Sequence, residues 1–253
     1  MSKRKIALAD SNTRQKKIPV VELFGPTAQG EGMLCGQISY FIRTGLCGHL
    51  CSWCDSLHAV LPREVKKNAT YMSQEEIAKR IVALTPGTDR GTWVTLTGGD
   101  PVIWDLTELV TRLKVAGYRV AVETQGALWQ DWLEHCDLVT CSPKPPSSGM
   151  AEKFKPEMLQ KYAARLRDHL VIKVVTFDGA DLNWATRIHT WMPRVRFFLS
   201  SGTPMSEDKT DLRLRILDGY KDLVERVLAT PSLHDVTVLP QVHSLIWQRE
   251  LGR

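Results

Sequence analysis

Short apolar runs alternate with amphipathic stretches along most of this chain. Runs rich in β-branched and aromatic residues predict strands at residues 20–24, 39–43, 92–97, 118–122, 137–141, 170–176, 195–199 and 236–239. Apolar residues spaced three or four positions apart predict helices from 73 towards 86, from 106 towards 117, and at 129–135, 181–191 and 211–228, with another before residue 170.

The first predicted helix has a defined start and a defined apolar face. Ser73 followed by Glu76 is a capping-box pattern. In this pattern the side chain of each residue accepts a hydrogen bond from the backbone N–H of the other. Ile77, Ile81 and Leu84 share one face of this helix.

The alternation of strands and helices indicates an α/β fold with a parallel sheet and right-handed crossovers. The pattern holds about six strand–helix units, fewer than the eight of a closed barrel. We therefore expect a partial (truncated) parallel β/α barrel.

Chemically unusual residues cluster where predicted strands end. The loops at residues 47–54, 98–101, 123–126 and 142–144 each follow the carboxyl end of a strand. In parallel sheets and barrels these ends meet on one face, where ligands bind. The sequence thus predicts that four separate loops form one site.

Composition narrows the class of protein. The chain has 253 residues, 43% hydrophobic, with a net charge of +5. We expect a basic, frayed tail at residues 1–17 and a single domain at 18–253. The tail has no interleaved aromatic residues, so a nucleic-acid partner is not expected. The lack of a run of about 18 apolar residues predicts no membrane span, and the lack of a signal peptide predicts a cytoplasmic protein.

Three cysteines follow the second predicted strand in a Cys-x3-Cys-x2-Cys spacing: Cys47, Cys51 and Cys54. Three thiolates are one short of the ligands for a 4Fe-4S cluster, which leaves one iron open to a small molecule. The alternative is a structural zinc site with His49 or His58 as fourth ligand, but zinc commonly joins two separated cysteine pairs.

Two further cysteines suggest no chemistry. Cys136 and Cys141 flank an apolar run, and we expect both to be small buried side chains.

Other candidates have plainer alternatives. Gly98-Gly99 with Asp100 is either a simple turn or a close backbone approach to a ligand, with Asp100 near its ammonium group. Arg43 ends a strand directly before the cysteines and suits a substrate carboxylate, unless it is an ordinary surface residue. A lone His243 is more often structural than catalytic.

Taken together, these motifs resemble a known family. The cysteine spacing with a Gly-Gly-acidic-Pro turn resembles the radical S-adenosylmethionine (SAM) superfamily. More specific runs resemble the 7-carboxy-7-deazaguanine synthases, from about residue 19 onwards. They are FGPTAQGEG at 24–32, FIR at 41–43, WCDS at 53–56, ETQG at 123–126, SPKPP at 142–146 and LPQVH at 239–243.

The resemblance implies a radical SAM lyase of queuosine and 7-deazapurine biosynthesis. It would convert 6-carboxy-5,6,7,8-tetrahydropterin to 7-carboxy-7-deazaguanine with loss of ammonia. It would be a homodimer that needs a 4Fe-4S cluster, SAM, Mg²⁺ and an electron donor such as flavodoxin. A glycyl-radical activase shares the cysteine spacing and stays an alternative, as does a zinc-stabilised binding module.

The resemblance also implies a role for individual residues. Cys47, Cys51 and Cys54 would hold the cluster, and Ser56 would bind magnesium. SAM would contact Trp53, Cys54, Asp55, Gly99, Glu123, Ser142, Pro143 and Lys144. The pterin would contact Ala28, Gln29, Gly30, Glu31, Arg43, Thr97 and His243.

Three positions depart from the family pattern without removing a required group. Leu46 replaces a frequent glycine, Ser56 a common threonine, and Asp100 the more usual glutamate. The shorter Asp100 would reach the SAM amine less far, by roughly one methylene.

Overall fold

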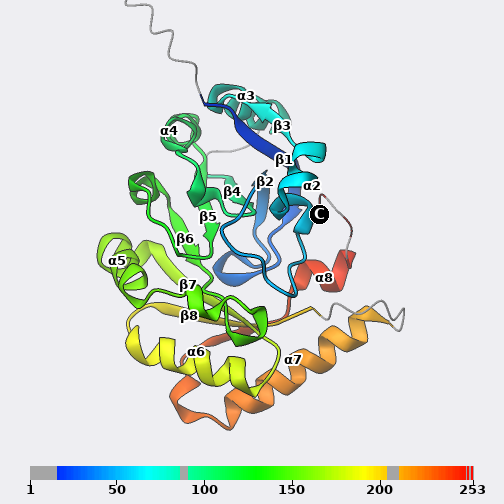
Figure 1. Ribbon diagram of the computed structural model, residues 1–253, viewed down its shortest axis with the longest axis vertical. Coiled ribbons are helices and arrows are strands. Elements are labelled where there is room, and N and C mark those ends of the chain that lie inside the picture. Colours follow the sequence, from blue (N-terminus) through cyan, green and yellow to red (C-terminus); the bar gives the residue numbers. More distant parts are fainter. Residues whose placement is uncertain (1–15, 86–90, 204–210, 249, 251, 253) are drawn as a thin grey trace, which may run out of the picture.

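The computed structural model describes residues 16–85, 91–203, 211–248, 250 and 252, which form one sheet flanked by helices (Figure 1). The strands are β1 (Ile18–Ala28), β2 (Ile38–Thr44), β3 (Thr70–Met72), β4 (Trp93–Gly98), β5 (Arg119–Thr124), β6 (Leu138–Cys141), β7 (Leu170–Thr176), β8 (Arg196–Ser201) and β9 (Thr237–Leu239).

The helices are α1 (Leu57–Val60), α2 (Pro62–Asn68), α3 (Gln74–Leu84), α4 (Thr107–Val115), α5 (Pro156–Leu166), α6 (Gly179–Trp191), α7 (Leu212–Leu228) and α8 (Val242–Trp247). Short 3-10 helices are η1 (Gly32–Leu34), η2 (Pro101–Ile103), η3 (Asp131–His135), η4 (Pro146–Ser148), η5 (Ala151–Lys153), η6 (Arg167–His169) and η7 (Pro231–Leu233).

The sheet is open, as the partial-barrel prediction requires. Its order is β3-β1-β2-β4-β5-β6-β7-β8-β9, so β3 and β9 form its two edges in the described part of the chain. Strands β2 and β4 to β9 pair in parallel. Helices α4, α5 and α6 lie along the outside of the curved sheet (Figure 1).

The first strand departs from the predicted parallel arrangement. Strand β1 pairs antiparallel with both β2 and β3. The loop between β1 and β2 runs over residues 29–37 and holds only η1. A parallel crossover needs a dozen or more residues, so this short connection forces an antiparallel return.

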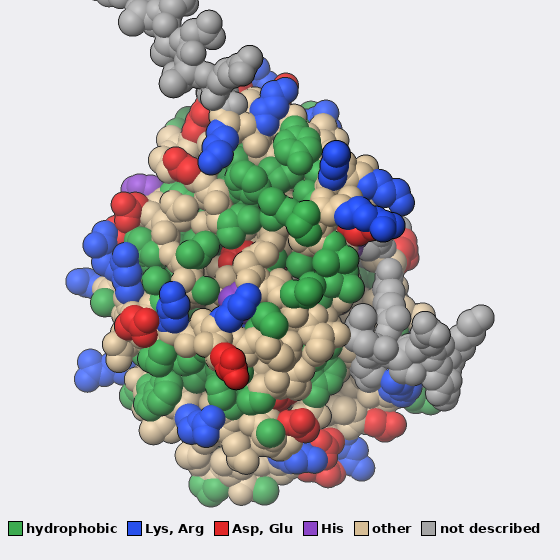
Figure 2. Space-filling model, in the orientation of Figure 1, with side chains coloured by type: hydrophobic (Ala, Val, Ile, Leu, Met, Phe, Trp, Pro, Cys, Tyr) green, Lys and Arg blue, Asp and Glu red, His purple; other side chains and the backbone are tan. Residues whose placement is uncertain are grey.

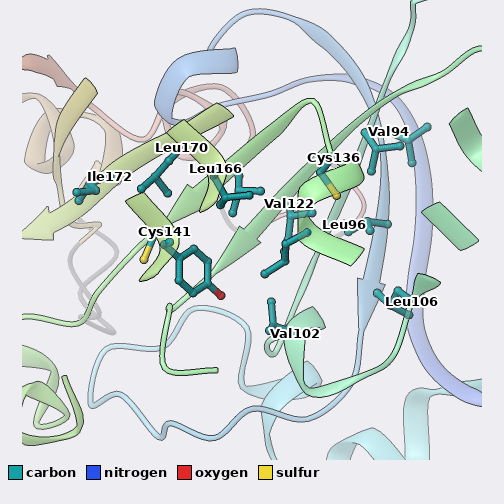
Figure 3. Packing of buried hydrophobic residues seen from close by; sticks show 14 of the residues in the cluster. Val94, Leu96, Val102, Leu106, Val122, Cys136, Cys141, Leu166, Leu170 and Ile172 are labelled. Atoms are coloured by element: carbon teal, nitrogen blue, oxygen red, sulfur yellow. The ribbon is translucent and has the colours of Figure 1, made fainter. Parts of the chain in front are cut away.

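The core fills the space between the sheet and the outer helices (Figure 3). Val94, Leu96 and Val122 on the strands are fully buried, as is Leu106 before α4. Cys136 and Cys141 belong to this core, with 2% and 1% of their surface exposed, which confirms them as small buried side chains.

Helix α3 confirms its predicted start. The Ser73 hydroxyl accepts from the Glu76 backbone N–H at 3.2 Å, and the Glu76 carboxylate accepts from the Ser73 N–H at 2.7 Å. Ile77 and Ile81 are fully buried, but Leu84 is 39% exposed. The helix ends at Leu84, and the following residue takes the buried place instead.

Other predictions meet the structure in different ways. Each predicted strand is present, whereas the helix predicted at 129–135 is the 3-10 helix η3. Most of the predicted basic tail lies outside the described residues.

No helix in the described ranges is long and apolar enough to cross a membrane. On the face shown in Figure 2, Lys and Arg side chains are interspersed with Asp and Glu.

Candidate active site

A cavity of about 300 Å³ opens at the carboxyl ends of the parallel strands. It brings together the residues predicted for the site except Pro143, which is buried beside it, and Asp100. The residues on its walls include Ala28, Gln29, Gly30, Glu31, Arg43, Cys47, Cys51, Trp53, Cys54, Asp55, Ser56, Thr97, Gly99, Glu123, Ser142, Lys144 and His243.

The cysteine loop, residues 47–54, begins directly after β2. Cys47, Cys51 and Cys54 are each partly exposed and all face the cavity. Burial raises the pKa of the Cys47 thiol to about 11, and burial also raises the pKa of Cys51. A bound metal would reverse this, because coordination deprotonates a thiol outright.

The three thiols fit a cluster better than a single zinc ion. Among the described residues, no three His, Cys, Asp or Glu side chains converge closely enough to hold one metal ion. A zinc site needs such convergence, whereas each thiolate of a 4Fe-4S site binds a different iron. His49 is buried in the same loop, and burial lowers its pKa to about 4, so its ring is neutral.

The Gly-Gly-Asp turn is fastened to the start of the cysteine loop. Gly99 N–H donates to the Thr44 carbonyl at 3.0 Å, and Asp100 N–H to the Leu46 carbonyl at 2.8 Å. A Cβ on Gly99 would lie 2.0 Å from that Leu46 oxygen, so only glycine allows this approach. The turn therefore determines where the backbone enters the cysteine loop.

Asp100 does not occupy the place expected from the sequence. Its side chain is fully buried behind the turn and lies outside the cavity wall, so it is not aimed at an ammonium group there. It accepts from the Thr124 hydroxyl at 2.8 Å and from Val102 N–H, as the cap of η2. Burial raises its pKa to about 6.

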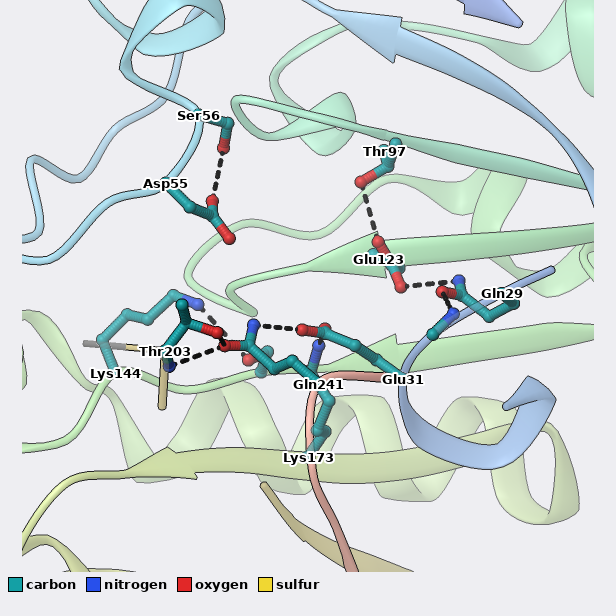
Figure 4. Close-up of polar contacts among 12 residues, drawn as sticks. Gln29, Glu31, Asp55, Ser56, Thr97, Glu123, Lys144, Lys173, Thr203 and Gln241 are labelled. Carbon is teal, nitrogen blue, oxygen red and sulfur yellow. Dashed lines mark hydrogen bonds and ion pairs between the residues drawn. The ribbon is translucent and has the colours of Figure 1, made fainter. Parts of the chain in front are cut away.

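Glu123 is held by two residues from other elements. It accepts from Gln29 Nε2 at 3.0 Å and from the Thr97 hydroxyl at 2.8 Å (Figure 4). Gln29 in turn accepts from Gly30 N–H at 2.7 Å through its amide oxygen. The loop after β1 and the ends of β4 and β5 thus form one polar wall.

A second carboxylate, Glu31, forms an ion pair that the sequence analysis missed. Glu31 pairs with Lys173 of β7 and accepts from the Gln241 amide (Figure 4). Gln241 also accepts from Thr203 N–H at 2.8 Å. Burial opposes ionisation of Glu31, but the charges of Lys173 and His243 outweigh it and lower its pKa to about 2.

Arg43 faces the cavity but is already paired. Its Nε lies 2.5 Å from Glu22, which also meets His58 Nε2 at 3.3 Å. Burial works to raise the pKa of Glu22, but the hydrogen bond with His58 and the charge of Arg43 prevail and lower it. One edge of the guanidinium is thus fixed in place while the group remains on the cavity wall.

Ser56 and Asp55 place two oxygens next to the last cysteine. The Ser56 hydroxyl donates to Asp55 at 3.0 Å and lies 3.9 Å from the Cys54 sulfur. Hydroxyl and carboxylate oxygens are ligands that suit Mg²⁺. The predicted magnesium ligand, Ser56, thus has a carboxylate beside it on the cavity wall.

Curated proteins resemble the chain over nearly its whole length. The 7-carboxy-7-deazaguanine synthase of Bacillus cereus is 40% identical over 241 residues, covering 93% of this chain and 99% of the relative. Its counterpart in Bacillus subtilis is 39% identical, covering 94% and 99%. The one from Koribacter versatilis is 30% identical, covering 88% and 94%. No sequence-family profile matches the chain.

Solved structures share the fold at lower identity. QueE from Escherichia coli superposes with a TM-score of 0.68 at 22% identity, over 93% of this chain and all of that one. Streptococcus suis SuiB bound to S-adenosylmethionine gives 0.53 at 11% identity, over 79% of this chain and 50% of that one.

Proposed function

The chain belongs to the 7-carboxy-7-deazaguanine synthase family, and from this membership we propose how its cavity serves the reaction. The chain is a radical SAM lyase that uses a 4Fe-4S cluster and SAM. Its substrate is 6-carboxy-5,6,7,8-tetrahydropterin, which loses ammonia to give 7-carboxy-7-deazaguanine, a precursor of queuosine and related deazapurines. The observation that supports this proposal is that three thiols and two hydrogen-bonded carboxylates face one cavity.

Cys47, Cys51 and Cys54 would hold the cluster. When bound, the cluster and SAM would supply the one-electron chemistry that the reaction needs. SAM would lie along Trp53, Asp55, Gly99, Glu123 and the 142–144 run. Pro143 would act by fixing the backbone between its neighbours, since it is not on the cavity wall.

The pterin would lie against the polar wall formed by the loop after β1. Glu31 is held ionised by Lys173, so it accepts hydrogen bonds from N–H groups of a neutral heterocycle. Arg43 would bind the substrate carboxylate, because its guanidinium keeps N–H donors beyond the one given to Glu22. Ala28, Gln29, Gly30, Thr97 and His243 would complete the contacts.

Mg²⁺ would bind at Ser56, where hydroxyl and carboxylate oxygens lie together. Its other ligands would be water and substrate oxygens, since Mg²⁺ keeps much of its hydration. We further propose a single domain from residue 18 to 253, a homodimer, an electron donor such as flavodoxin, and a cytoplasmic location.

The test is anaerobic turnover by the reconstituted protein with reductant, SAM, Mg²⁺ and the carboxylated tetrahydropterin. We expect the deazaguanine product by mass spectrometry, and its absence would refute the proposal. Arg43→Ala is expected to keep the brown cluster and raise KM for the pterin by roughly tenfold to a hundredfold, the effect of losing one charged hydrogen-bonded contact. An unchanged KM would remove Arg43 from the binding site.

A further inference from the structure

Residues 142–153, which follow β6, form a covering segment that lies over most of the cysteine loop. Ser52 donates its backbone N–H to the Ser148 carbonyl at 3.0 Å and its hydroxyl to the Ser147 carbonyl at 2.7 Å. Lys153 donates to the Gly48 carbonyl at 2.8 Å. The loop is therefore held from outside by a segment about a hundred residues away in sequence.

Asp181, at the start of α6, anchors this covering segment. Its carboxylate is fully buried and accepts three hydrogen bonds. One oxygen accepts from Ser147 N–H at 2.9 Å, and the other from the Ser147 hydroxyl at 2.6 Å and Phe177 N–H at 3.0 Å. Neither the proposed cofactor contacts nor the proposed substrate contacts include Asp181.

The hydrogen bonds from Trp53 to Asp181 have a fixed direction. The Trp53 indole N–H lies 2.9 Å from the Ser147 hydroxyl oxygen, and an indole nitrogen can only donate. The Ser147 hydroxyl therefore accepts from Trp53, and it donates its own hydrogen to Asp181.

Asp181 also holds the backbone of a residue whose ring packs against the indole. Phe177, whose N–H it binds, packs its ring against Trp53 with centroids 5.2 Å apart. Lys144 from the same covering segment lies 5.7 Å from the Trp53 ring centroid. One buried carboxylate thus orders both the acceptor for the indole and the ring beside it.

We infer that Asp181 is a positioning residue for the cofactor site. Through Ser147 it orients Trp53 and holds the segment that covers the cysteine loop. This inference rests on the proposed function, because it takes the loop to hold the cluster and Trp53 to contact SAM. Without Asp181, the loop loses its outer support and the indole loses its fixed direction.

Asparagine cannot replace Asp181 in this role. The carboxylate meets three donors, and each amide orientation turns an N–H towards at least one of them. We expect Asp181→Asn to release iron to a chelator about tenfold faster. We also expect it to bind SAM about tenfold more weakly, measured from the SAM-induced change in the electron paramagnetic resonance signal of the reduced cluster.

Ser147→Ala removes the middle hydroxyl of the hydrogen-bonded series from Trp53 to Asp181. It should also speed iron release and weaken SAM binding. Asp178→Asn is the matched control: Asp178 is exposed, caps α6 by accepting from Asp181 N–H at 2.9 Å, and asparagine caps equally well. We expect wild-type iron retention and SAM binding in this control.

Wild-type iron release and SAM affinity in both Asp181→Asn and Ser147→Ala would overturn the inference. So would equal losses in the Asp178→Asn control, since they would indicate general weakening of α6. If Asp181→Asn does not fold by circular dichroism, Ser147→Ala decides. None of these readouts needs the pterin, so failure of the wild type to form product would refute the proposed function separately.

Discussion

Asp100 is fully buried and accepts hydrogen bonds at one carboxyl oxygen, while the other has no partner among the described residues. We predict that the free energy of unfolding of Asp100→Asn increases relative to that of the wild type as the pH rises. Burial raises the pKa of Asp100 from 3.8 to about 6 in the folded protein. Between these values the folded state binds more protons than the unfolded state, so rising pH destabilises the wild type.

The size of the effect follows from the pKa. A pKa of about 6 against an ordinary 3.8 corresponds to about 3 kcal/mol, at 1.36 kcal/mol for each tenfold change in proton affinity. This stability is present below pH 4 and is lost as the pH rises to about 6 and beyond. The asparagine amide adds an offset of its own, but that offset does not vary with pH.

Urea unfolding of the cluster-free protein and the variant, from pH 4.5 to 7.5, measures the difference. We expect the variant to gain about 2 kcal/mol relative to the wild type over this range, because part of the stabilisation by the Asp100 proton is already lost at pH 4.5. Asp105→Asn is the control, because hydrogen bonds from Thr107 lower the pKa of Asp105 below 3.8, so its difference from the wild type should stay nearly flat above pH 4.5. A difference between Asp100→Asn and wild type that stays flat with pH would refute the reasoning.

Three further changes test other parts of the site. Gly99→Ala places a Cβ 2.0 Å from the Leu46 carbonyl oxygen, so iron per chain after anaerobic reconstitution should drop severalfold; full iron content would contradict this. Lys173→Met leaves Glu31 buried without its cation and should lower the free energy of unfolding at pH 7 by about 3–5 kcal/mol in urea; an unchanged midpoint and slope would argue against a stabilising ion pair. Cys51→Ala should lose the visible absorbance of the cluster, and a retained brown colour would exclude Cys51 as a ligand.

Strands were predictable where burial dictates a nearly continuous apolar run. Strand β7 has the predicted bounds because all of its residues are buried. Strand β3 has only three residues and depends on pairing with the start of β1, so no local pattern indicates it. Helices α1 and α2 are short as well, and only Pro62 at the start of α2 gives a sequence signal.

The site was predictable to the extent that strand ends position it. Loops after parallel strands meet on one face whatever their sequence, which is why distant motifs could be grouped. Lys173 was missed because it reads as one position of an apolar strand. A single lysine within such a strand is a usable signal, but its partner Glu31 is 142 residues away. Such a pairing depends on the assembled sheet.

The orientation of Asp100 also lay beyond sequence reasoning. A carboxylate after two glycines can turn towards a ligand or back to cap the next turn. Here the Thr124 hydroxyl and the start of η2 lie on the inner side, and the side chain turns to them. The residues around Asp100 do not reveal where Thr124 lies, because Thr124 belongs to a neighbouring strand.

One part of the cavity wall is built from segments near the two ends of the described chain. Gly30 approaches the C-terminal segment so closely that Val242 N–H donates to its carbonyl at 3.0 Å, and Glu31 meets Gln241 across 210 residues. During synthesis the cysteine loop therefore leaves the ribosome long before this wall can form. A growing chain acquires its metal ligands early, and its substrate pocket only when the last helix folds back onto the first loop.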